Sequence, residues 1–279
     1  MIKACVIGWP ISHSRSPLIH GYWLRQHGID GSYTRQPVEP SDLAQFLNGL
    51  EASGYAGCNV TIPHKENAFA LVTPADQTTR RLGAVNTVYV KDGQTFGTNT
   101  DGEGFLNSLR HSLPDLSLRG SRAVVLGAGG ASLAIVNALL EQGASEIAVA
   151  NRTLEKAEIL RSRFGARIRP VAWDRAAGEL SDCNLLVNTT SLGMKGQPEL
   201  MLDLARLPSS AVVTDIVYTP LRTKLLVDAA ARGNPVVEGL GMLLHQAVRG
   251  FSLWFGARPE VTPELHDLVA RDIDPGYRR

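Results

Sequence analysis

The stretch 122-RAVVLGAGGAS-132 decides the fold of this 279-residue chain. Residues 122–126 form a short apolar run, which is typical of a buried strand in a parallel sheet. A glycine cluster follows, and a helix is expected at 133–142. Gly127 would permit a tight turn, while Gly129 and Gly130 would let the backbone approach a pyrophosphate at the helix N-terminus. The sixth position is Ser132 instead of glycine, and a purely structural turn is the alternative, but the strand–turn–helix context favours cofactor binding.

Strand and helix patterns alternate along the whole chain, which indicates the α/β class. The second part predicts a parallel, doubly wound sheet, with further strands at 146–150, 167–171, 183–188 and 211–217. The first part predicts strands at 3–8, 32–38, 57–60, 86–91 and 95–98, and helices at 17–27, 41–52 and 63–72. Two more helices are expected at 242–255 and 263–272.

The composition excludes several classes of protein. Hydrophobic residues make up 44% and charged residues 20% of the chain, as in a soluble globular protein, and the formal net charge is +1 without a basic stripe for nucleic acid. No apolar run approaches the roughly 18 residues of a membrane span, and no signal-peptide pattern is present. Cys5, Cys58 and Cys183 are widely separated and odd in number, and the histidines lack metal-ligand spacing. We therefore expect a cytoplasmic protein without disulfides, metal, membrane or nucleic-acid partner.

The end of the next strand predicts which dinucleotide binds. NAD-selective folds place an acidic residue there, about 20 residues after the glycines, to hold the ribose 2′-hydroxyl. This chain has Asn151, Arg152 and Thr153 instead, with Lys156 one turn further on. A guanidinium, a hydroxyl and an ammonium suit a 2′-phosphate, whereas cations at a helix start are otherwise disfavoured. An ordinary basic helix start is the alternative, and NADP is the prediction.

The stretch 59-NVTIPHK-65 places a lysine where a helix disfavours a cation. With Pro63 as the first helical position, Lys65 falls in the first turn, at the positive end of the helix dipole. That field should lower the proton affinity of the amine, which suits it to acid–base chemistry near neutral pH. On this segment alone, a solvated surface lysine is the simpler interpretation.

Polar residues end several other segments of the first part. Ser14 and Ser16 precede a helix N-terminus, where hydroxyls and free N–H groups suit a carboxylate, although Ser16 could simply be the N-cap. Asn86 and Asp101 end neighbouring segments, and Asp101 could also be an N-cap. Each residue is unremarkable by itself.

Together, and in order, these motifs resemble the shikimate dehydrogenase family over nearly the whole chain. The matching motifs are GxPxxHSxSP from Gly8, NVTxPxK from Asn59, GAxNT from Gly83, NTDGxGF from Asn99, GAGGAS from Gly127, NRT from Asn151, DxVYxP from Asp215 and GxxMLxxQ from Gly239. The resemblance implies an α/β substrate-binding domain at 1–105, a Rossmann-type doubly wound NADP-binding domain at 106–238, and C-terminal helices at 239–279 that return to the first domain. The substrate residues before Asp101 and the cofactor residues after Gly127 lie on separate parts of the chain, so hydride transfer needs the cleft between them to close. We expect motion near 101–106 and 236–241, where Gly239 and Gly241 would precede a helix.

The resemblance assigns roles to matching positions. The catalytic pair would be Lys65 and Asp101. The substrate carboxylate would be bound by Ser14, Ser16 and Tyr218, and the ring hydroxyls by Asn59, Thr61, Asn86 and Gln246. The cofactor would be held by Gly127, Ala128, Gly129, Gly130, Ala131, Asn151, Arg152, Thr153, Lys156, Thr189, Ile216, Gly239 and Met242.

The implied reaction is the NADPH-dependent, reversible reduction of 3-dehydroshikimate to shikimate, in aromatic amino-acid and chorismate biosynthesis. A quinate or dual quinate/shikimate dehydrogenase is the rival within the class. Quinate-using relatives tend to have Thr at the position of Ser16 and are more often NAD-linked, so the resemblance implies that Ser16 and Arg152 favour shikimate and NADP. A ligand-binding domain that has lost catalysis is the rival from another class, and the presence of both Lys65 and Asp101 argues against it. The sequence leaves open whether the protein is a monomer or a homodimer, and whether Trp9 contacts a ligand.

Overall fold

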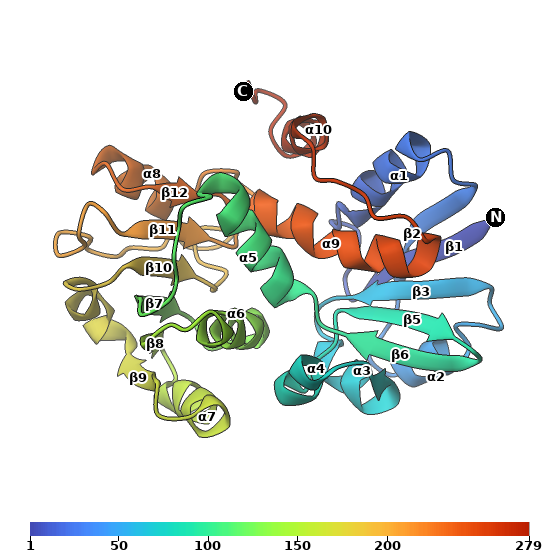
Figure 1. The fold of residues 1–279 in the computed structure, drawn as a ribbon, viewed down its shortest axis with the longest axis horizontal. Coiled ribbons are helices and arrows are strands. Elements are labelled where there is room, and N and C mark those ends of the chain that lie inside the picture. Colours follow the sequence, from blue (N-terminus) through green and yellow to red (C-terminus); the bar gives the residue numbers. More distant parts are fainter. Residues whose placement is uncertain (279) are drawn as a thin grey trace. The chain divides into compact units, whose positions relative to one another are not determined.

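The computed structural model describes residues 1–278, which form two compact units (Figure 1). The first comprises Met1–Asp101 and Leu244–Val269, and the second comprises Gly102–Leu243 and the chain from Ala270 on. The domain boundaries expected from the sequence fall after residues 105 and 238, whereas the units divide after residues 101, 243 and 269. No helix of residues 1–278 combines the length and hydropathy needed to cross a membrane.

The first unit is built on a mixed six-stranded sheet of order β2-β1-β3-β5-β6-β4. Its strands are β1 (Ile2–Gly8), β2 (Gly31–Pro37), β3 (Tyr55–Val60), β4 (Thr73–Pro74), β5 (Thr87–Lys91) and β6 (Gln94–Thr98). Strands β2, β1 and β3 are parallel, and β5 pairs antiparallel with β3 and β6. The helices are α1 (Ser16–Gln26), α2 (Leu43–Asn48), α3 (Lys65–Leu71) and α4 (Gln77–Leu82), with most of α9 (Gly239–Phe255).

The two faces of this sheet carry different cores, because successive side chains of a strand point to opposite faces. Cys5, Ile7, Cys58 and Val60 join an aliphatic cluster with residues of α2 and α3. The opposite face meets an aromatic cluster formed by His20, Trp23, Tyr33, Phe251 and Trp254. The indole of Trp254 donates to the carbonyl of Val88 (2.9 Å), which fixes α9 on the sheet.

The second unit contains a wholly parallel sheet of order β12-β11-β10-β7-β8-β9. The strands are β7 (Arg122–Leu126), β8 (Glu146–Asn151), β9 (Ile168–Ala172), β10 (Leu185–Asn188), β11 (Val212–Asp215) and β12 (Val236–Val237). The helices are α5 (Asp101–Ser112), α6 (Gly130–Glu141), α7 (Leu154–Phe164), the 3₁₀-helix η1 (Trp173–Leu180) and α8 (Lys224–Ala231). Helix α10 (Pro263–Ile273) belongs to the first unit up to Val269 and to the second from Ala270 on. This is the dinucleotide-binding strand order, with its switch point between β7 and β10. The predicted doubly wound sheet is confirmed.

Several local predictions were wrong. The helix expected from Pro63 begins at Lys65, because the N–H of His64 bonds the carbonyl of Thr61 and closes a turn that contains Pro63. Ser16 is the first residue of α1 instead of its N-cap. Strands β4 and β12 and helix α4 were not expected.

Gly239 and Gly241 lie inside the first turn of α9, not in a segment before it. A Cβ on Gly239 would lie only 2.6 Å from the carbonyl oxygen of Val217. The absence of a side chain at this position therefore allows close packing of α9 against the end of β11. The motion expected near 236–241 stays a prediction.

Candidate active site

Lys65 and Asp101 form an ion pair in the first unit. Lys65 is the first residue of α3 and Asp101 the first of α5, and Lys65 Nζ lies 2.5 Å from Asp101 Oδ2. The Asp101 side chain is 9% exposed and the Lys65 side chain 22%, so the lysine remains partly accessible. The carboxylate compensates a cation that the dipole of α3 disfavours. The pair therefore holds an accessible amine at a defined position.

The second oxygen of Asp101 is held by Asn86. Asn86 Nδ2 donates to Asp101 Oδ1 (2.8 Å), and the backbone N–H of Thr100 donates to Asn86 Oδ1 (2.9 Å). Since a backbone N–H can only donate, it fixes which end of the Asn86 amide faces Asp101. Within residues 1–278 the Asp101 carboxylate accepts no backbone N–H bond, so it does not cap α5.

Asn59 and Gln246 belong to the same hydrogen-bonded network. Asn59 Nδ2 donates to the carbonyl of Asn86 (3.1 Å) and to Thr87 Oγ1 (3.2 Å). Gln246 Oε1 lies 3.4 Å from Asn86 Nδ2, and its carbonyl accepts from Thr100 Oγ1 (2.8 Å). The structure thus brings Lys65, Asp101, Asn86, Asn59 and Gln246 together, and it adds Thr100, which the sequence analysis missed although it stands beside Asp101 in the NTDG motif.

Ser14 and Ser16 form a separate small group at the start of α1. Their hydroxyl oxygens lie 3.2 Å apart, and Ser14 Oγ accepts the N–H of Ser16 (3.3 Å). Arg35, which the sequence analysis also missed, donates Nε (2.9 Å) and Nη2 (2.5 Å) to the Ser14 carbonyl. Two hydroxyls with a guanidinium behind them suit an anionic group. Thr61 lies between β3 and α3 and is half-buried; Trp9 is 45% exposed.

The candidate cofactor residues lie at the carboxyl ends of the strands of the second unit. Gly127 has φ +103°, and a Cβ there would lie 2.9 Å from Thr189 Oγ1, so only glycine fits this turn. The N–H of Ala128 donates to Asn151 Oδ1 (3.1 Å), which ties the turn after β7 to the end of β8. Gly129 and Gly130 face open space, and Gly130 and Ala131 begin α6. This loop leaves a helix N-terminus open to an anion.

Arg152, Thr153 and Lys156 are exposed around the start of α7. Among the described residues, the side chains of Arg152 and Lys156 form no ion pair or hydrogen bond, and the hydroxyl of Thr153 does not cap the helix. Two unpaired cations at the positive end of a helix dipole are unfavourable unless an anion binds there. The arrangement therefore fits a phosphate group.

The remaining candidates follow β11. Ile216 donates its N–H to the carbonyl of Asn188 (3.1 Å), and Gly239 packs against the same strand end. Met242 lies in α9 and is half-buried. Tyr218 belongs to the second unit, whereas the other candidate substrate residues belong to the first.

Asp215 is a buried carboxylate that organises this end of the sheet. It accepts from Asn188 Nδ2 (2.9 Å), the N–H of Val217 (2.9 Å) and Thr223 Oγ1 (2.7 Å). Burial raises the pKa of the Asp215 carboxyl, and these three donors oppose that rise. In the sequence Asp215 stands out only as the first residue of the DxVYxP motif, since nothing in a single sequence shows that a carboxylate will accept three hydrogen bonds.

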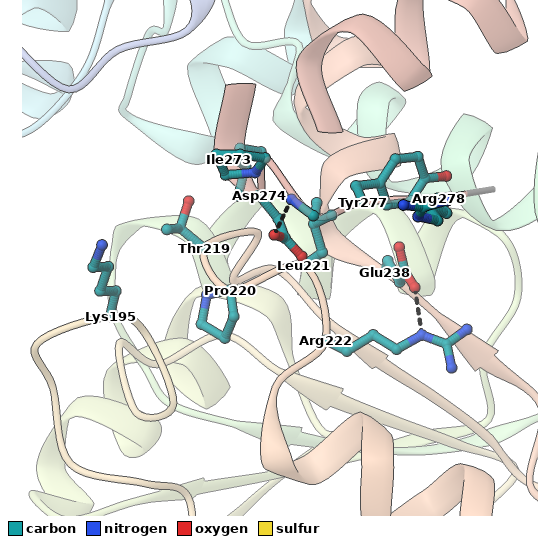
Figure 2. A pocket seen from close by; sticks show the side chains of 12 residues that line it. Lys195, Thr219, Pro220, Leu221, Arg222, Glu238, Ile273, Asp274, Tyr277 and Arg278 are labelled. Atoms are coloured by element: carbon teal, nitrogen blue, oxygen red, sulfur yellow. Dashed lines mark hydrogen bonds and ion pairs between the residues drawn. The ribbon is translucent and has the colours of Figure 1, made fainter. Parts of the chain in front are cut away.

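A hollow of about 990 Å³ lies elsewhere in the second unit (Figure 2). It lies between the loop after β11 and the chain that follows α10, and the ion pair of Arg222 with Glu238 (2.8 Å) lies on its wall. None of the candidate site residues lines it. Residues 1–278 contain no group of three or more His, Cys, Asp or Glu side chains placed to hold a metal ion.

Three family models match the chain in succession. They are the shikimate dehydrogenase substrate binding domain at 6–88, shikimate / quinate 5-dehydrogenase at 109–216, and the shikimate 5′-dehydrogenase C-terminal domain at 239–263. Shikimate dehydrogenase (NADP(+)) of Rhodopseudomonas palustris strain TIE-1 is 56% identical over 272 residues, which cover 98% of this chain and 97% of that protein.

Solved structures show the same likeness. The shikimate 5-dehydrogenase of Thermus thermophilus, in complex with NADP(H) and shikimate, has a TM-score of 0.87 at 36% identity, over 98% of this chain and 100% of that one. The quinate dehydrogenase of Corynebacterium glutamicum, in complex with NAD, has a TM-score of 0.88 at 30% identity, over 96% and 98%. The resemblance seen in the ordered motifs is confirmed: this chain belongs to the shikimate dehydrogenase family.

Proposed function

We propose that this chain catalyses the NADPH-dependent, reversible reduction of 3-dehydroshikimate to shikimate, a step of chorismate and aromatic amino-acid biosynthesis. The observation that carries the proposal is the Lys65–Asp101 pair, whose second carboxylate oxygen is held by Asn86. A relative that had lost catalysis would have no reason to keep an accessible amine fixed by a buried carboxylate.

Lys65 is the proton donor in this proposal. Reduction of a ketone by hydride builds negative charge on the carbonyl oxygen, so a donor must stand beside that oxygen. NADPH, when bound, supplies the hydride. Lys65 Nζ gives its proton to the developing alkoxide, and in the oxidation direction the amine takes the proton back from the hydroxyl. Asp101 holds the amine in place.

The substrate would be held by two groups of side chains. Ser14 and Ser16, with Tyr218 from the second unit, would bind its carboxylate. Thr61, Asn86 and Gln246 would bind its ring hydroxyls together with Asn59. Both Nδ2 hydrogens of Asn59 are already used within the protein, so its remaining capacity is a lone pair on Oδ1, and we propose that Asn59 accepts a hydrogen bond from the substrate.

The cofactor would be NADP(H), bound by the second unit. The open loop at Gly127–Ala131 would hold the pyrophosphate, and Arg152, Thr153 and Lys156 the 2′-phosphate. Thr189, Ile216, Gly239 and Met242 would complete the site beyond the switch point. The absence of an acidic side chain among Asn151, Arg152 and Thr153 supports NADP over NAD, because an acid there would repel the phosphate.

A quinate dehydrogenase is the second candidate, since the structure of one is closely similar. Ser16 and Arg152 favour shikimate and NADP. The experiment that separates the two is a set of four initial rates, with shikimate or quinate and with NADP⁺ or NAD⁺. We expect the shikimate and NADP⁺ combination to have the highest kcat/KM; a higher value with quinate or NAD⁺ would replace the first proposal by the second.

We further propose that the first unit is the substrate domain and the second the cofactor domain. The cysteines Cys5, Cys58 and Cys183 are free and buried, which supports a reducing compartment such as the cytoplasm. A monomer and a homodimer both remain compatible with the proposal.

A further inference from the structure

Strand β2 contributes none of the proposed substrate-binding residues, yet one of its side chains contacts one of them. Tyr33 is buried, and its hydroxyl donates to Asn59 Oδ1 at 2.5 Å. Strand β1 lies between β2 and β3, so the tyrosine must reach across it to meet Asn59. The residue opposite Tyr33 on β1 is Ala4, whose methyl group leaves room for the ring.

The surroundings of Tyr33 hold its ring in one position. The imidazole of His20 stacks on it with centroids 4.0 Å apart and planes 11° from parallel, and the indole of Trp254 lies 5.8 Å away. Neither ring nitrogen of His20 has a hydrogen-bond partner in the described chain, so the imidazole serves here as a packing surface. Burial lowers the pKa of His20 to about 3 and raises that of Tyr33 well above its usual range. The tyrosine therefore keeps its proton and donates.

This donation agrees with the orientation that the rest of the network gives to Asn59. With Oδ1 toward Tyr33, Nδ2 faces two acceptors, the carbonyl of Asn86 and Thr87 Oγ1. Thr87 Oγ1 in turn lies 3.0 Å from Asn86 Oδ1, to which it donates. Asn86 then donates to Asp101. If the Asn59 amide were reversed, its NH₂ would face the Tyr33 hydroxyl. Its oxygen would then face the carbonyl of Asn86 and Thr87 Oγ1, which both act as acceptors, so the observed orientation is favoured.

We propose that Tyr33 is a positioning residue, which fixes Asn59 Oδ1 as the acceptor for a hydroxyl of the substrate. The inference rests on the proposed function, because it names how one proposed substrate contact is held in place. In this proposal Tyr33 acts through its hydrogen bond to Asn59 and not by contact with the substrate. Removal of the Tyr33 hydroxyl should therefore leave kcat/KM for shikimate unchanged in a variant that already lacks the Asn59 amide.

The test is a double-mutant cycle in steady-state kinetics, with Tyr33→Phe, Asn59→Ala and the double variant. Tyr33→Phe keeps the ring that packs on His20 and loses only the hydroxyl. We expect it to raise KM for shikimate by about 5- to 15-fold, the factor that corresponds to one hydrogen bond, and to leave KM for NADP⁺ unchanged. In the Asn59→Ala background the same change should alter kcat/KM by less than about twofold.

The matched control is Tyr55→Phe, which removes a hydroxyl that accepts from Gln36 (3.0 Å) on the same sheet, away from the network. It should retain wild-type KM. A wild-type KM for Tyr33→Phe, or an equal loss with and without Asn59, would overturn the positioning role while the activity of the wild type stands. An inactive wild type and control would instead contradict the proposed function.

A second variant tests the orientation without changing Tyr33, should Tyr33→Phe fold poorly. Asn59→Asp replaces the NH₂ by an oxygen that would face the carbonyl of Asn86 and Thr87 Oγ1. We therefore expect its KM for shikimate to rise at least as much as that of Asn59→Ala. A wild-type KM for Asn59→Asp would show that these contacts do not fix the Asn59 amide, and the inference would be wrong.

Discussion

Lys65 and Asp101 are each the first residue of a helix, and their side chains meet at 2.5 Å. The two residues sit in equivalent electrostatic positions with opposite charges. The N-terminal field of α5 favours the carboxylate, and that of α3 disfavours the ammonium, so the ion pair is what keeps the cation in place. Asn86 and the backbone of Thr100 fix the carboxylate from the other side.

Arg152→Ala should weaken the use of NADP⁺ by about 1.5–3 kcal/mol in kcat/KM, the range for hydrogen bonds to a charged group, with little change for NAD⁺. The reason is that the unpaired guanidinium would contact only the 2′-phosphate. Initial rates with both cofactors measure the difference, and Arg161→Ala, an exposed arginine later in α7, is the matched control. Equal losses with the two cofactors would mean that Arg152 does not bind the 2′-phosphate.

Gln246→Ala should raise KM for shikimate by about 5- to 15-fold and leave the Kd for NADP⁺ nearly unchanged, because the residue belongs to the first unit and to the Asn86 network. Substrate kinetics and direct titration of the cofactor measure the two quantities. A shift in cofactor affinity of the same size as the shift in KM would contradict a role confined to the substrate.

His20 should make the folded state sensitive to acid. Its pKa is lowered to about 3 by burial, more than the nearby Asn59 amide raises it, while in the unfolded chain it is about 6.5. Between these two pH values His20 is protonated in the unfolded state but not in the folded state. The contribution of His20 to the free energy of unfolding is therefore fully present above pH 6.5 and is lost as the pH falls toward 3.

The measurement is the free energy of unfolding by urea at pH 7 and pH 5, for the wild type and for His20→Phe. The wild type should lose about 2 kcal/mol more than the variant between these two pH values. Comparing the two losses cancels the carboxylates that both proteins share. Parallel losses would show that His20 is protonated in the folded protein.

The sequence predicted the second unit well because its signals are local. Strands β7, β8, β10 and β11 are mostly apolar runs, helical patterns follow β7 and β8, and Gly127 stands where the turn needs a positive φ. The start of α3 was predicted at Pro63 instead of Lys65, because the fixed φ of proline suits a turn as well as a first helical position. Helix α4 was missed because its six residues, Gln77–Leu82, are mostly polar. Its ends are marked by the bond from the N–H of Thr79 to Asp76 and by Gly83 in the left-handed conformation.

The candidate site was predicted as a set of residues, not as an arrangement. Lys65 and Asp101 were paired through the order of motifs. Their separation of 36 residues does not by itself indicate that the two helix starts lie close together. Tyr33 and Thr100 escaped notice because their roles depend on tertiary contacts with Asn59 and Asn86. A buried tyrosine in a strand looks like ordinary core until the sheet order places its hydroxyl beside an amide.

The central claim, that Lys65 and Asp101 act as one proton-transferring unit, is tested most directly by the double-mutant cycle in kcat for shikimate oxidation. Lys65→Ala should lower kcat by roughly 10²–10⁴-fold and Asp101→Asn should also lower it, with the double variant losing less than the product of the two factors. Lys91→Ala, an exposed lysine at the end of β5, is the matched control and should keep wild-type kcat. Near-normal turnover of Lys65→Ala, or losses that simply multiply, would contradict the account.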